Sequence, residues 1–148
     1  MPRSSLTVER FIYEELHPLH LQFSATNGVF SGSFDDYWGV GNLEEIGNGL
    51  TNFPKRIGDE YKYEAGSSRL EDNYAYHFIL RAYTTGSSGH CALQFTINKN
   101  SSPPHEGICT FSIPAEVAAI NRLGKLFCRF AKLEHHKFVW TETDESLD

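Results

Sequence analysis

Long apolar runs are missing from this chain of 148 residues. Near the N-terminus, charged residues stand on both sides of Phe11 and Ile12, which is not the pattern of a secretory signal. No other segment approaches the roughly 18 uninterrupted apolar residues that a membrane span needs. The sequence therefore predicts a cytoplasmic protein with no membrane partner.

Basic charge is also scarce. The chain has 13 Lys and Arg against 19 Asp and Glu, which gives a formal net charge of −6. Proteins that bind nucleic acid usually present a basic field to the phosphates, and this chain has no such excess. The charge balance predicts no nucleic-acid partner and favours a basic protein as the partner instead.

The patterns that mark metal, cofactor or catalytic sites are absent as well. The three cysteines, Cys91, Cys109 and Cys128, have no CxxC spacing, and the seven histidines form no HExxH. The chain contains no GxSxG elbow, and the glycines at 39 and 41 lack the Lys and Ser/Thr of a phosphate loop. We therefore predict buried free thiols, no metal, no cofactor and no enzymatic activity.

One long segment has helical periodicity, and it spans residues 113–133. Apolar residues recur there at steps of three and four, and the basic residues gather toward its C-terminal half, where the helix dipole favours them. Pro114 suits the first turn of such a helix. The pattern predicts a long helix, buried over most of its circumference, that lies across a sheet.

A shorter helix and several strands are predicted before it. Asn42 is a suitable N-cap with Glu45 three residues later, and apolar residues then follow at helical spacing until Pro54. Alternating residues indicate the strands, and Asn27-Gly28 between two alternating runs predicts a hairpin. The strand-like runs, of which the first two flank this hairpin, are 19–23, 29–38, 60–64, 74–84, 90–98, 108–113 and 137–141.

These elements predict an α+β fold in a single domain over residues 1–148. The expected architecture is a curved, mainly antiparallel sheet of about six to eight strands, with the long C-terminal helix on one face and one short helix. No internal repeat is evident. The acidic tail, residues 142–148, is expected to be frayed.

The one candidate site is a group of acidic and aromatic residues near the first helix. Tyr and Trp are favoured contact residues and carboxylates at a rim steer association, so this group could bind a basic partner. Alternatively, the acids merely cap a helix and end a strand. The predicted contact residues are Asp35, Asp36, Tyr37, Trp38, Glu44 and Glu45.

The stretch VFSGSFDDYWGVGNLEEIGNGLTNFP, residues 29–54, with EYKYEAG after it, resembles small bacterial proteins. Some of these are similar to the immunity proteins encoded beside polymorphic toxins, in particular the WapI-type group. The resemblance implies a cytoplasmic binding protein without enzymatic activity, whose acidic surface would neutralise a basic toxin.

Two functional hypotheses follow from the sequence. The first is a non-enzymatic protein-binding module, in particular an immunity protein against a cognate toxin. The alternative is a domain that binds a small ligand or a lipid on the concave face of the sheet. The sequence leaves the oligomeric state open.

Overall fold

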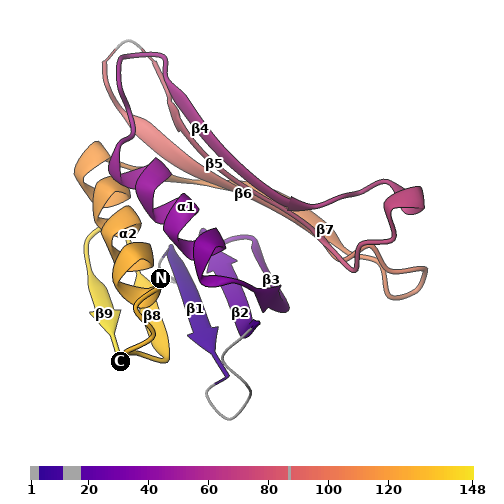
Figure 1. The fold of residues 1–148 in the computed structure, drawn as a ribbon. Coiled ribbons are helices and arrows are strands. Elements are labelled where there is room, and N and C mark those ends of the chain that lie inside the picture. The colour runs from indigo at the N-terminus through magenta and orange to yellow at the C-terminus, as the bar shows by residue number, and fades with distance from the viewer. Residues whose placement is uncertain (1–3, 12–17, 87) are drawn as a thin grey trace.

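The computed structural model describes residues 4–11, 18–86 and 88–148, which form two α-helices and nine strands (Figure 1). The helices are α1 (Val40–Thr51) and α2 (Val117–Phe130), and a 3-10 turn, η1, spans Leu70–Asp72. The strands are β1 (Ser5–Arg10), β2 (Leu19–Thr26), β3 (Ser31–Trp38), β4 (Glu60–Gly66), β5 (His77–Thr84), β6 (Cys91–Asn98), β7 (Ile108–Ala115), β8 (Lys137–Trp140) and β9 (Glu145–Leu147). None of the described helices is both long enough and apolar enough to cross a membrane.

The strands form two antiparallel sheets. Sheet A has five strands in the order β3-β2-β1-β8-β9, and sheet B has four in the order β4-β5-β6-β7. The α+β composition agrees with the sequence, but the predicted single curved sheet of about six to eight strands is wrong. Alternating apolar and polar residues indicate that a segment is a strand, but they do not indicate which strands it pairs with. Here β8 returns to pair with β1, and β4 starts a second sheet on β5.

The chain consists of two halves that repeat one topology. The first half runs β1-β2-β3-α1-β4 and the second runs β5-β6-β7-α2-β8. In each half the strand that follows the helix joins the sheet of the other half, so β4 pairs with β5 and β8 pairs with β1. This internal repeat is not evident in the sequence, because the two halves share the order and pairing of their elements and not their residues.

The repeat extends to the register of the strands, because each sheet contains an equivalent row of paired residues. In sheet A one row of paired residues crosses the strands as Phe138, Val8, Phe23 and Phe34. In sheet B the matching row is Tyr63, Leu80, Phe95 and Phe111. All eight side chains are buried, and the two inner faces share one hydrophobic core. Aromatic contacts such as Phe34 with Phe78, 4.7 Å between ring centroids, join the sheets.

Each helix packs on one sheet and crosses the other helix. The Phe127 ring of α2 meets Phe138 of sheet A edge-on, with the ring centroids 5.2 Å apart. On the other side, the Asn42 side chain of α1 donates a 2.8 Å hydrogen bond to the Tyr63 hydroxyl of sheet B. The two helices lie side by side in Figure 1. They therefore fill the space between the sheets at one end of the core.

Both helix starts differ from the sequence prediction. Pro114 lies in β7 and not in the first turn of α2, which begins at Val117. The N-cap of α1 is Gly39, whose N–H donates to Oδ1 of Asn42 over 2.9 Å, so Asn42 is not the N-cap but the third helical residue. With 12 and 14 residues the helices are similar in length, and the contrast of one long and one short helix does not hold.

The C-terminal residues 142–148, which composition suggested would be frayed, include β9. This strand pairs with β8 through Val139 and Ser146. Arg122 of α2 reaches the same segment, with its guanidinium donating to the carbonyl oxygens of Asp144 and Thr141 over 2.7 and 2.9 Å.

Candidate functional site

The six predicted contact residues occupy three different environments. Asp35 and Tyr37 point to the outer face of sheet A, whereas Trp38 is only 4% exposed and donates its indole N–H to the Tyr76 hydroxyl over 2.9 Å. Asp36 is half-buried on the inner side of β3. Glu44 and Glu45 are exposed on α1. The structure therefore brings Asp35 and Tyr37 together, but it does not place all six residues on one surface.

Asp35 and Tyr37 belong to a small cluster on the outer face. His20 of β2 lies between them, with its Nε2 2.8 Å from the Asp35 carboxylate and its ring stacked on Tyr37 at 4.6 Å. The Phe11 ring lies 4.3 Å from His20 on the other side. Tyr37 itself is 53% exposed.

Three adjoining hollows surround β3, and we call them together the β3 groove. Their volumes are about 410, 320 and 440 Å³, and each contains Ser33 in its lining. The first lies over the outer face of sheet A and is lined mainly by hydroxyl side chains: Ser5, Thr7, Ser24, Thr26, Ser31 and Ser33. The other two lie between β3 and sheet B.

An overhanging end of sheet B forms the far wall of the β3 groove. Figure 1 shows that the end of sheet B carrying η1 and the β6–β7 connection extends past β3. β3 touches this wall at Gly32, where a Cβ would lie only 2.5 Å from Sγ of Cys109 and 3.2 Å from Ile97. Beyond this contact, Ile97 and Ile108 line the groove together with Lys99 and Gly107.

The free edge of β3 faces this groove. The N–H of Asn27 donates to the carbonyl of Phe30 over 3.0 Å, which fixes the ladder so that Gly32 and Phe34 exchange hydrogen bonds with β2. The N–H and C=O groups of Ser31 and Ser33 consequently point away from β2. Among the described residues they have no backbone or side-chain hydrogen-bond partner, and such unpaired edge groups are ready to bind another chain.

Exposed aromatic rings stand at both ends of β3. Phe30, at the hairpin that precedes the strand, is 59% exposed, and Tyr37 lies near the strand's other end. Lys99 is the only cation among the described residues that line the groove, and Asp35 is the only acid. The lining of the groove is thus close to neutral and rich in hydroxyl groups.

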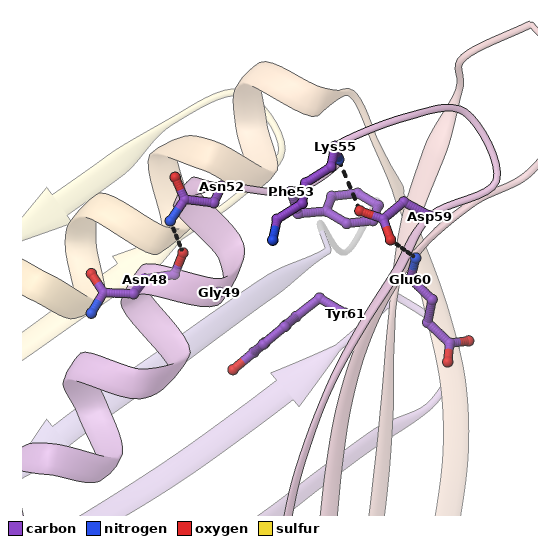
Figure 2. A pocket seen from close by; sticks show the side chains of 8 residues that line it. All are labelled: Asn48, Gly49, Asn52, Phe53, Lys55, Asp59, Glu60 and Tyr61. Atoms are coloured by element: carbon purple, nitrogen blue, oxygen red, sulfur yellow. Dashed lines mark hydrogen bonds between the residues drawn. The ribbon is translucent and has the colours of Figure 1, made fainter.

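A larger hollow, of about 560 Å³, lies between the end of α1 and the start of β4 (Figure 2). Gly49 packs directly on the Tyr61 ring, and Figure 2 shows the Lys55 side chain pointing into the space above that ring. The acids there are already engaged, since Asp59 accepts from the N–H groups of Lys55 and Glu60, and the Glu60 carboxylate pairs with Arg81. This hollow therefore offers fewer free polar groups than the β3 groove.

The groups that commonly carry chemistry are occupied or shielded. Burial raises the pKa of all three cysteine thiols, which keeps them protonated near neutral pH. His77 is 2.6 Å from the Glu64 carboxylate, and that hydrogen bond is the main cause that lowers the pKa of Glu64. Within the part of the chain that the structure describes, no three His, Cys, Asp or Glu side chains come together to hold a metal.

No family model matches the chain, and no match was found among curated proteins. Solved structures with a similar arrangement include WHY3 from Arabidopsis thaliana (TM-score 0.45, 17% identity, covering 88% of this chain and 82% of that one). Another is WHY1 from Arabidopsis thaliana (TM-score 0.46, 16% identity, covering 88% of this chain and 84% of that one). A third is the plant transcriptional regulator PBF-2 (TM-score 0.47, 15% identity, covering 88% of this chain and 76% of that one). Identities this low concern the arrangement of elements alone.

These findings correct several sequence predictions. The similar structures are plant proteins and none is an immunity protein, so the assignment to the WapI-type bacterial immunity proteins is wrong, and with it the toxin partner. The small-ligand or lipid-binding alternative and the exclusion of nucleic acid are corrected on the same comparison, which includes a transcriptional regulator. None of the three is described as an enzyme.

Sequence reasoning missed the residues that form most of the groove. Ser31, Gly32 and Ser33 are among them, and from the sequence these three are predicted only as part of the strand-like run 29–38. A signal was present, because two small hydroxyl residues around a glycine in a strand leave its edge and outer face uncovered by bulky side chains.

Proposed function

We propose that this protein binds single-stranded nucleic acid along the β3 groove, without catalysing a reaction on it. The observation that supports this most is the combination of three adjoining hollows around β3, a free strand edge facing them, and an exposed ring near each end of that strand. Proteins that bind single strands use aromatic rings on which bases stack and a groove that follows the backbone.

The size of the groove suits a short run of nucleotides. β3 has eight residues, which at about 3.4 Å per residue gives a length near 27 Å. Phe30 and Tyr37 stand at its two ends, and each can stack on a base. The hydroxyl side chains between them can donate to or accept from phosphates and base edges.

The acidic net charge does not exclude this role. Electrostatic attraction to phosphates depends on the local field, and the groove carries Lys99 against Asp35, whose carboxylate is hydrogen-bonded to His20. Stacking on a ring is worth about 1–3 kcal/mol per base and does not need a positive surface. The proposed binding is thus driven by stacking and hydrogen bonds rather than by charge.

The absence of catalysis is part of the proposal. Burial raises the pKa of the thiols and keeps them protonated, and His20, His77 and His90 are each paired with a carboxylate. Among the described residues that line the β3 groove, Cys109 is the one thiol, and it lies close to Gly32.

Fluorescence anisotropy with a labelled 20-nucleotide single strand, in DNA and RNA forms, tests the proposal. Phe30→Ala and Tyr37→Ala should each weaken binding about 5- to 100-fold, because each removes one stacking ring. Ile57→Ala is the matched control: Ile57 is 67% exposed but lies in the connection between α1 and β4, outside the groove. The proposal is wrong if neither strand binds, or if both groove variants bind as the original protein does.

A further inference from the structure

We infer that the free edge of β3 reads the bases of an extended, unstacked strand, so that the ligand is a pyrimidine-rich single strand. This inference rests on the proposed function and adds the class of sequence that the groove selects. It follows from the spacing of the free backbone groups along β3.

Free peptide groups repeat at every second residue of an edge strand. In β3 they belong to Ser31, Ser33 and Asp35, because Gly32, Phe34 and Asp36 face β2 in the hydrogen-bonded positions. At about 3.4 Å per residue, successive free groups are about 6.8 Å apart. Stacked bases along a strand follow at about 3.4 Å, half that distance.

The base spacing of a stacked strand therefore does not match the spacing of the free groups along this edge, whereas the base spacing of an extended strand can match it. Purine runs, which stack strongly, must be pulled apart before one base can meet each free group. Pyrimidine runs stack weakly and are already extended, so they incur a smaller cost. The same spacing excludes a duplex, whose base edges are paired and stacked.

Pyrimidine chemistry also matches the edge. Each free position offers one N–H donor and one C=O acceptor side by side. Thymine and uracil carry an N3–H donor next to carbonyl acceptors, so one base can form both bonds with the N–H and C=O of one residue. Side chains crowd this contact little at Ser31 and Ser33, which flank Gly32.

The wall of sheet B limits the approach to this edge. Tyr76, Ala75 and Ser101 line the groove together with Phe34 and Asp35, so the ligand meets sheet B on one side as it reaches this edge. A pyrimidine ring is smaller than a purine and needs less room beside sheet B while its edge meets β3. Size and spacing thus select the same class of base.

Ser33→Pro tests the inference directly. The Ser33 N–H is not used in the ladder with β2, and Gly32 before it tolerates the conformation that proline imposes, so the substitution removes one free donor and leaves the sheet intact. Affinity for a 12-nucleotide dT strand should fall about three- to tenfold. Ser33→Ala, which keeps the N–H and loses only the hydroxyl, is the matched control and should lower affinity less.

The original protein should also bind the dT strand at least about tenfold more tightly than a dA strand of equal length, and should not bind the duplex of the two. Slower hydrogen exchange of the Ser33 amide with dT bound, measured by NMR, gives a readout that does not depend on the proline variant folding.

Two kinds of failure can be told apart. If dA binds as well as dT and the Ser33 amide exchanges at an unchanged rate, the edge does not read the bases and this inference is wrong, while single-strand binding stands. If no single strand binds at all, the proposed function itself is wrong.

Discussion

Gly47 and Gly124 face each other where α1 crosses α2, each at the same position of its helix. A Cβ on Gly47 would lie 2.9 Å from the carbonyl oxygen of Gly124, and a Cβ on Gly124 would lie 2.8 Å from that of Gly47. The same added Cβ atoms would lie 2.5 Å from Sγ of Cys128 and from Thr51, which again occupy matching places in the two helices. The helices can approach this closely only because neither residue has a side chain.

We expect Gly47→Ala and Gly124→Ala each to lower the free energy of unfolding by about 1–3 kcal/mol, because the added methyl group forces the helices apart. Gly41→Ala is the control: nothing lies within 4 Å of a Cβ there, and alanine favours a helix over glycine, so stability should hold or rise by up to about 1 kcal/mol. Urea unfolding followed by circular dichroism measures all three. Equal stability of all the variants would mean that the helices separate at no cost.

Tyr76→Phe should destabilise the protein by about 1–3 kcal/mol, because it leaves the buried indole N–H of Trp38 without its 2.9 Å acceptor. Tyr74→Phe serves as the control, since Tyr74 is 54% exposed and its loss of a hydroxyl should change stability by less than about 0.5 kcal/mol. The comparison is again made by urea unfolding. Identical midpoints for the two variants would contradict the importance of this bond.

Alkaline pH should weaken the fold through Tyr61. Burial is the main cause that raises the pKa of Tyr61 to about 12, with the Glu45 carboxylate adding to it, whereas an unfolded tyrosine titrates near 10. The folded state thus holds a proton that the unfolded state releases. Stability from this group is complete below about pH 10 and is lost as the pH rises toward 12.

In unfolding experiments between pH 8 and 12, Tyr61→Phe should therefore lose less stability than the original protein. It should not remove the alkaline loss entirely, because burial also raises the pKa of Tyr63 and Tyr76. Parallel pH profiles for the two proteins would show that Tyr61 is solvated in the folded state.

Binding to a single strand should depend only weakly on salt. Each phosphate contact with a cation contributes a slope of about 0.7 in a plot of log affinity against log salt concentration, and Lys99 is the one cation among the described groove residues. We expect a slope below about 1 in magnitude, and a slope near zero for Lys99→Gln. A slope of about 3 or more would place the ligand on another, basic surface.

The candidate site could be predicted from the sequence only in part. The predicted site grouped Asp35 and Tyr37 with Trp38, and the structure places Asp35 and Tyr37 on the exposed face of β3. The alternation along β3 could have shown that Trp38 points inward, on the opposite face. The overhang of sheet B, which forms the second wall of the groove, could not be predicted from the residues of β3.

What the sequence determined by itself was local: where strands and helices occur, which side chains are buried, and that the hairpins are antiparallel. Periodicity contains this information because each residue's side of a strand or helix follows from its neighbours. The tertiary structure decided the rest, namely the division into two sheets, the exchange of β4 and β8 between the halves, and the free edge of β3. These depend on pairings between residues far apart in the chain, such as Val8 with Phe138, which no local pattern specifies.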